Sequence, residues 1–258
     1  MNRIQLWNSY YTITRKETVR IFRISIQTFL PSVITSLLYF TVFGYILGSR
    51  IEVIEGFSYM QFVVPGLVML SVITNAFTNV STSFFAAKFM ARNIDELLVS
   101  PTPPWVIIAG YVSGGMIRGI CVGLLVMLAS LVYTTLPMSH PFIILLFLIL
   151  SSLLFSLGGL INGMYGKSFD SISIIPTFVI TPIVYLAGVF YSIHQLPPFF
   201  QQITYLNPVF YIINGFRYGF LGVADVPFTT CISVLGGLIL ASFLGAYWII
   251  RQGFGLKQ

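Results

Sequence analysis

Six stretches of this chain are each long enough and apolar enough to cross a lipid bilayer. They run at about residues 27–47, 57–87, 105–133, 141–165, 172–192 and 227–250, and only the third contains a charged side chain. A bilayer core about 30 Å thick needs roughly 20 apolar helical residues. Only 8% of the residues are charged, against about 25% in soluble domains, so water cannot be the main solvent. The pattern predicts an all-α polytopic membrane protein with six transmembrane helices in a single domain, 1–258.

Basic residues are distributed unequally over the segments that join these spans. One side of the membrane would carry Arg3, Arg15, Lys16, Arg20, Arg23, Lys88, Arg92, Lys167, Arg251 and Lys257, and the other only Arg50 and Arg217. Because cytoplasmic loops are enriched in Lys and Arg, both termini are expected to be cytoplasmic. Arg118 is the one charge inside a predicted span, where it either lines a polar cavity or extends toward the cytoplasm.

Residues 1–26 precede the first span and have a different pattern. Basic and apolar side chains recur at helical spacing on two different sides: Lys16, Arg20 and Arg23, then Val19, Phe22 and Ile26. This periodicity predicts an amphipathic interface helix on the membrane surface, with its basic side chains toward anionic headgroups. The alternative is an ordinary positively charged flank of the first span.

A short charged stretch, 89–101, separates the second and third spans. Asn93 and Glu96 have the spacing of a capping box, and Ile94, Leu97 and Leu98 form one apolar face. Three prolines end the helix, which comprises Arg92, Asn93, Ile94, Asp95, Glu96, Leu97 and Leu98. Since two turns are unstable alone in water, this cytoplasmic helix must pack on something, either a groove in a soluble partner or its own protein.

The segment 193–226 is aromatic and apolar, but Pro197-Pro198 and Asn207-Pro208 interrupt it. Its two pieces are too short to span a bilayer, so they predict short re-entrant or interfacial helices on the outer side. The alternative is a large aromatic loop with no role in transport.

The residues of known catalytic and metal sites are missing. Gly166-Lys167-Ser168 lacks the first glycine of a phosphate-binding loop, because position 161 is isoleucine. The histidines stand apart from acidic residues, and Cys121 and Cys231 lie in apolar runs, so neither predicts a metal site or disulfide. An enzyme is therefore not expected.

Two further patterns concern the inside of the membrane. All seven acidic residues lie outside the predicted spans, which disfavours an ion-coupled transporter. Around Arg118, Gly110/Gly114 and Gly115/Gly119 form two GxxxG pairs, which allow close helix contact and would also permit a dimer.

Three segments, taken in order, resemble the ABC-2 type transporter permease family. They are GFSYMQFVVPGLVMLSVITNAF (56–77), SFFAAKFMARNIDELLVSPTPPWVIIAGY (83–111) and LNPVFYIINGFRYGFLG (206–222). The resemblance runs over nearly the whole chain. It implies the ABC-2 permease fold, a homodimer in the bacterial inner membrane, and two copies of a separate ABC-type ATP-binding subunit. ATP and Mg would bind that partner, so no cofactor is expected in this chain, and no nucleic acid.

The resemblance also assigns roles to residues. Arg92–Leu98 would be the coupling helix, and the helix with Lys16, Arg20 and Arg23 would touch the ATPase. Pathway and gate candidates are Arg118, Phe199, Phe200, Tyr205, Phe210, Tyr211, Phe216 and Arg217. The function expected is the permease subunit of an ATP-driven exporter; the alternatives are an ion-coupled secondary transporter and a membrane scaffold that moves nothing.

Overall fold

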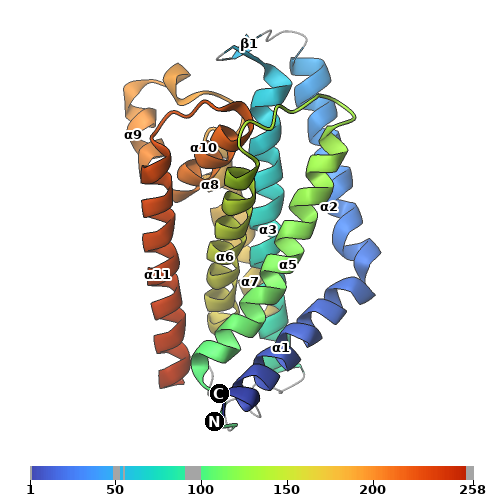
Figure 1. Cartoon of the computed structure of the whole chain (residues 1–258), viewed down its shortest axis with the longest axis vertical. Coiled ribbons are helices and arrows are strands. Elements are labelled where there is room, and N and C mark those ends of the chain that lie inside the picture. Colours follow the sequence, from blue (N-terminus) through green and yellow to red (C-terminus); the bar gives the residue numbers. More distant parts are fainter. Residues whose placement is uncertain (1, 49–52, 55, 91–99, 254–258) are drawn as a thin grey trace.

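The computed structural model describes residues 2–48, 53–54, 56–90 and 100–253. These residues are mostly helical, and two short strands, β1 (Val53–Ile54) and β2 (Phe57–Ser58), pair antiparallel. Figure 1 shows the helices side by side in one bundle. The beginning of α1 (Arg3–Arg23) and the last turn of α11 (Phe228–Gln252) lie at one end, and β1 and α9 (Pro198–Leu206) lie at the other.

Five helical segments among the described residues are long and apolar enough to cross a membrane. They are α2 (Ser25–Tyr39) with the start of the π-helix η1 (Phe40–Leu47), then α3 (Tyr59–Phe89), α5 (Pro104–Ser130), α6 (Pro141–Tyr165) and α11. They correspond to the first, second, third, fourth and sixth predicted spans. The bounds of α6 are those predicted, and α3, α5 and α11 begin or end within three residues of the prediction.

In place of the fifth span predicted at 172–192, the structure has three short helical pieces. The chain forms α7 (Phe169–Ile174), the π-helix η2 (Ile175–Ile180) and α8 (Thr181–Tyr185), together 17 residues. Pro176 and Pro182 have no N–H to donate within these helices. The carbonyl of Pro176 accepts from the hydroxyl of Thr181 at 2.9 Å. At 1.5 Å per residue the segment is about 26 Å long, shorter than a bilayer core of about 30 Å. Six full spans are therefore not observed in the described chain.

Helix α3 is the centre of the bundle. It begins with a capping box, in which Ser58 Oγ accepts from the Gln61 N–H at 3.3 Å and Gln61 Oε1 accepts from the Ser58 N–H at 3.2 Å. In its most apolar stretch of 18 residues, 78% of the residues are buried, against 17% in the corresponding stretches of the first span and of α11. Helices α5, α6 and α10 (Pro208–Leu221) all contact α3. The core therefore surrounds α3, and α2 and α11 are peripheral.

Helix α5 makes close contacts through both of its GxxxG pairs. Gly110 and Gly114 face α1, where a Cβ atom on Gly114 would lie 2.6 Å from the side chain of Glu17. Gly119 faces α3, where a Cβ atom would lie 3.0 Å from Ala76. The expected close contacts are therefore made within the chain. Because these faces are occupied, they do not support a dimer.

Helix α1 crosses α5 and buries a face that the sequence did not predict. Ile13, Glu17 and Ile21, spaced at i, i+4 and i+8, are buried, with Glu17 only 1% exposed. The predicted apolar side, Val19, Phe22 and Ile26, is exposed. Helix α1 ends at Arg23 and α2 begins at Ser25, with Ile24 between them in a non-helical conformation (φ −111°, ψ 37°). Glu17 lies outside the predicted spans, as expected, but it is buried where α1 packs on α5.

The segment 193–226 contains a short 3-10 turn, η3 (Ile193–Gln195), followed by α9 and α10. Asn207 separates the two helices: its Oδ1 accepts from the Val209 N–H at 2.9 Å and its Nδ2 donates to the carbonyl of Ile183 at 2.6 Å. Helix α10 ends at Gly222, whose positive φ of 74° suits glycine. Most of α10 is buried against α3, α6 and α11, so it is part of the core.

Candidate functional site

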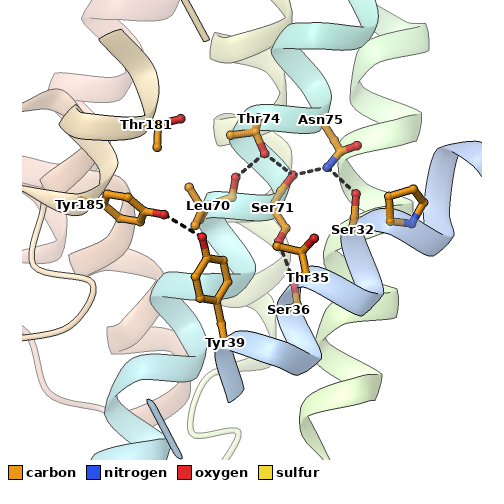
Figure 2. A pocket seen from close by; sticks show the side chains of 11 residues that line it. Ser32, Thr35, Ser36, Tyr39, Leu70, Ser71, Thr74, Asn75, Thr181 and Tyr185 are labelled. Carbon is orange, nitrogen blue, oxygen red and sulfur yellow. Dashed lines mark hydrogen bonds between the residues drawn. The ribbon is translucent and has the colours of Figure 1, made fainter. Parts of the chain in front are cut away.

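A pocket of about 280 Å³ lies between α2, α3 and α8 (Figure 2). Helix α2 contributes Ser32, Thr35, Ser36 and Tyr39, which at i, i+3, i+4 and i+7 share one helix face. The remaining lining residues are Pro31, Leu70, Ser71, Thr74, Asn75, Thr181 and Tyr185. Most of the 11 side chains carry a hydroxyl and none is charged. The pocket is therefore a polar, uncharged surface within the apolar part of the bundle.

Hydrogen bonds between side chains connect the walls of this pocket. Ser36 Oγ lies 3.1 Å from Ser71 Oγ and joins α2 to α3. The hydroxyls of Tyr39 and Tyr185 lie 2.8 Å apart and join α2 to α8 (Figure 2). Such bonds between membrane helices are each worth roughly 0.6 to 2 kcal/mol. They hold a peripheral helix, α2, at a defined position against the core.

A charged cluster lies beside the pocket, on the side of α1. The carboxylate of Glu17 accepts from the hydroxyl of Ser83, which is 2.7 Å from both oxygens, and from Arg20 Nη2 at 2.8 Å. Arg20 Nη2 also donates to Asn79 Oδ1 at 2.9 Å, and Arg118 Nη1 reaches the same oxygen at 3.5 Å. The cluster thus connects α1, α3 and α5, and it holds two guanidinium groups for one carboxylate.

Asn75 connects the charged cluster to the pocket. Its Oδ1 accepts from Arg118 Nε at 3.3 Å and from Arg118 Nη2 at 3.1 Å. Its Nδ2 donates to Ser32 Oγ at 3.0 Å and to the carbonyl of Ser71 at 2.9 Å (Figure 2). All the capacity of this amide to donate is used, and its oxygen faces the arginine. A continuous set of hydrogen bonds therefore runs from Glu17 on α1 to Ser32 on α2.

The predicted residues of the cytoplasmic side lie in different environments. Lys16 and Arg23 are exposed on α1, as a surface helix requires. Arg20 is only 35% exposed, because it pairs with Glu17 inside the bundle. Arg118 belongs to the charged cluster and does not line the pocket itself. The predicted coupling residues Arg92, Asn93, Ile94, Asp95, Glu96, Leu97 and Leu98 lie outside the described residues.

Four of the predicted gate residues belong to α9 or to the start of α10. Phe199 and Phe200 are exposed, with ring centroids 5.5 Å apart. Tyr205 is partly exposed, and its carbonyl accepts from the hydroxyl of Tyr211 at 2.8 Å. Helix α9, which carries Phe199, Phe200 and Tyr205, lies at the end of the bundle opposite α1 (Figure 1).

The other predicted gate residues, Phe210, Phe216 and Arg217, are buried on α10. The guanidinium of Arg217 lies 3.7 Å from the ring centroid of Phe62 and donates to the carbonyl of Gly188 at 2.6 Å. A buried arginine over an aromatic face is stabilised by cation–π attraction. The structure therefore places the gate candidates in two groups, one exposed and one in the core.

Sequence reasoning missed Glu17, Asn75 and Asn79. A signal for Glu17 was available, since it shares the i, i+4, i+8 stripe with Ile13 and Ile21. The asparagines are one turn apart on α3, and only the fold shows that arginines of two other helices reach them. Within the described ranges, no group of three His, Cys, Asp or Glu side chains could hold a metal ion.

Long apolar helices around an uncharged polar pocket are the architecture of a multi-pass membrane protein. The chain belongs to the ABC-2 type transporter family, whose model matches residues 8–221. It is 53% identical to the inner membrane transport permease YadH of Escherichia coli strain K12, over 98% of both chains. It is 24% identical to nodulation protein J of Rhizobium leguminosarum bv. viciae, over 98% of this chain and 95% of that one.

Proposed function

We propose that this chain is the transmembrane permease subunit of an ATP-driven exporter, works as a dimer and is coupled to a separate ATP-binding subunit. Membership of the ABC-2 family supports the transport role, and the similarity to YadH, an inner membrane transport permease, supports an inner-membrane location. One structural observation carries the mechanism. The hydrogen-bonded path from Glu17 through Arg20, Asn79, Arg118 and Asn75 joins the N-terminal helix to the polar pocket.

In this mechanism, both termini are cytoplasmic and two ATP-binding subunits, each with ATP and Mg, dock on the stretch 92–98 and beside α1. When the subunits approach each other, α1 moves relative to α3 and α5. The Glu17–Arg20 pair moves with α1 and pulls on Asn79, which Arg118 also contacts. Because Asn75 holds both Arg118 and Ser32, the change reaches the pocket wall. The uncharged hydroxyls would then bind and release neutral polar groups of the cargo.

The position of the pocket supports a dimer. It lies between the first span and the short helix α8. In the most apolar stretch of the first span, only 17% of the residues are buried. Hydroxyl groups facing lipid have few hydrogen-bond partners, so a second polar surface would stabilise them. A second copy placed there would complete a pathway at the dimer axis. The exposed Phe199 and Phe200 of α9 would gate its outer end.

One observation favours an ion-coupled transporter as a second candidate. The buried carboxylate of Glu17 is the kind of group that such transporters use to bind a proton or sodium ion. Its pairing with Arg20 and Ser83 argues for a structural role. Transport by proteoliposomes that needs ATP and persists without an ion gradient would support the exporter, and transport driven by a gradient alone would support the second candidate.

The first test is a tagged pull-down from native membranes in mild detergent, read by mass spectrometry. We expect an ABC-type ATPase in stoichiometric amount with the natural chain and its loss with Leu97→Asp. The matched control is Leu206→Asp, the same change at a position 84% exposed on α9, at the other end of the bundle. Retention of no ATPase by a folded, abundant chain would overturn the proposal.

A membrane scaffold that moves nothing would also retain the ATPase, so a second measurement is needed. The ATPase rate of the reconstituted complex is compared for the natural chain and for Asn75→Leu, which cuts the path between α1 and the pocket. An exporter should lose severalfold in its coupled rate while the complex stays assembled. An unchanged rate would favour the scaffold.

A further inference from the structure

Helix α1 carries a groove on its exposed side, in addition to the face that it buries against α5. The groove has a volume of about 550 Å³, and its lining comes from the exposed side of α1 and from the joint with α2: Tyr11, Thr12, Arg15, Lys16, Val19, Arg20, Arg23 and Ile24. Four of these side chains are basic and none is acidic. The groove is therefore a concentrated positive surface on a chain with few charges.

Three of the four cations are available to a ligand. Arg20 is held by Glu17 and Asn79 on the buried side of the helix. Arg15, Lys16 and Arg23 are exposed, and no hydrogen bond or ion pair to them is found in the part of the chain that the structure describes. Three unneutralised charges within about two and a half helical turns attract an anion strongly.

The surroundings of the groove are apolar. Val19 is 45% exposed, Phe22 52% and Ile24 44%, and the first residues of α2 continue this surface with Ile26 at 74%. A soluble phosphate would gain nothing from these side chains. A lipid gains twice, because its headgroup meets the cations and its acyl chains meet the apolar side chains. The composition of the surface therefore favours a lipid over a soluble anion.

The depth of the groove agrees with this chemistry. The groove ends at Ile24, and the first candidate span begins at Ser25. The basic side chains therefore lie where the hydrocarbon core ends and lipid headgroups begin. Cations on an amphipathic helix at this level bind anionic lipids.

We propose that the groove on α1 is a binding site for an anionic glycerophospholipid, whose phosphate is contacted by Arg15, Lys16 and Arg23. The acyl chains lie along Val19, Phe22 and the start of α2. Occupation of this site anchors α1 at the membrane surface. The site does not depend on what the protein transports.

The test measures lipid binding to the purified, delipidated chain by native mass spectrometry. The probes are phosphatidylglycerol, phosphatidylcholine with the same acyl chains, and glycerol 1-phosphate. The natural chain should bind phosphatidylglycerol at least tenfold more tightly than phosphatidylcholine and should not retain glycerol 1-phosphate. Equal binding of the two lipids, or retention of the free phosphate ester, would overturn the proposal without any variant.

A variant then locates the site. Arg15→Gln, Lys16→Gln and Arg23→Gln together should weaken phosphatidylglycerol binding roughly tenfold to a hundredfold, since each cation near the surface contributes about a factor of five. The matched control removes the same charge elsewhere, with Arg3→Gln, Lys167→Gln and Arg251→Gln, all exposed. Equal losses in both variants would show an effect of net charge and contradict the site.

Two further outcomes distinguish lipid from protein. Arg15→Lys with Arg23→Lys keeps the charge and should keep phosphatidylglycerol binding. If the glutamine variant binds phosphatidylglycerol like the natural chain but loses the ATP-binding subunit in the pull-down, the groove serves that protein instead and the lipid proposal fails.

Discussion

The guanidinium of Arg118 donates two hydrogen bonds to one acceptor, Oδ1 of Asn75, at 3.3 Å from Nε and 3.1 Å from Nη2. The nitrogen of the same amide belongs to the pocket, where it donates to Ser32. A positive charge in the middle of a membrane helix is thus placed against the pocket wall without entering the pocket. Any shift of Arg118 reaches the pocket through this single side chain.

Asn75→Leu should destabilise the protein, because it removes the acceptor of a partly buried arginine and the donor to Ser32. Leaving such groups without partners costs about 1 to 3 kcal/mol in free energy of unfolding. The measurement is unfolding in detergent followed by circular dichroism. Ser32→Ala removes only one of these bonds and should cost roughly 0.6 kcal/mol. Equal losses for the two variants would show that Arg118 does not depend on Asn75.

Glu17→Ala should be more damaging than a change on a surface helix. It removes the carboxylate that Arg20 and Ser83 share, and breaking a buried ion pair costs roughly 3 to 5 kcal/mol. Since Arg20 is 35% exposed and keeps Asn79, the lower end of that range, about 3 kcal/mol, is expected.

A double-mutant cycle checks this pair. Glu17→Ala combined with Arg20→Met should destabilise by clearly less than the sum of the two single changes, because the second change removes the charge that the first left unpaired. Additive losses in free energy of unfolding would mean that the two side chains do not interact.

Gly114→Val should displace α1 from α5. A Cβ atom at this position would lie 2.6 Å from the Cβ atom of Glu17, closer than two carbon atoms can approach. The released helix should be cleaved by trypsin after Arg15 and Lys16 severalfold faster than in the natural chain. Gly236→Val on α11 is the control, because nothing lies within 4 Å of a Cβ atom there. Similar cleavage rates in both variants would argue against the packing described for α1.

Tyr39→Phe and Tyr185→Phe should have the same effect, alone or together. Each removes the same hydrogen bond of 2.8 Å between α2 and α8, which is worth about 1 kcal/mol in free energy of unfolding. The double variant should therefore be no less stable than either single one. Tyr165→Phe, at a tyrosine 52% exposed, should change nothing. A double variant with twice the loss would show that the two hydroxyls act separately.

The apolar helices were largely predictable, because hydrophobicity and length alone determine whether a helix can cross a membrane. Helix α6 has the predicted bounds, Pro141–Tyr165. The fifth predicted span is not confirmed as one long helix, for a reason that hydropathy does not measure. Its apolar composition is uniform, but Pro176 and Pro182 remove backbone donors and part of the segment becomes a π-helix.

The candidate site was not predictable to the same degree. Arg20 and Asn79 are 59 residues apart, and Arg118 and Asn75 are 43 residues apart, so no local pattern pairs them. The burial of Glu17 depends on Gly114 of a different helix, which leaves room for it. Helical periodicity describes one helix at a time, whereas this site takes its residues from five helices, α1, α2, α3, α5 and α8.

Only one residue, Ile24, separates α1 from α2, and the consequence is mechanical. A long flexible linker lets the segments on its two sides rotate independently, whereas a single linking residue leaves little freedom for this. Torque applied to α1 is therefore transmitted to α2, whose side chains from Ser32 to Tyr39 form one wall of the pocket. We therefore expect the N-terminal helix and the pocket wall to move together, through this joint as well as through the hydrogen bonds of the charged cluster.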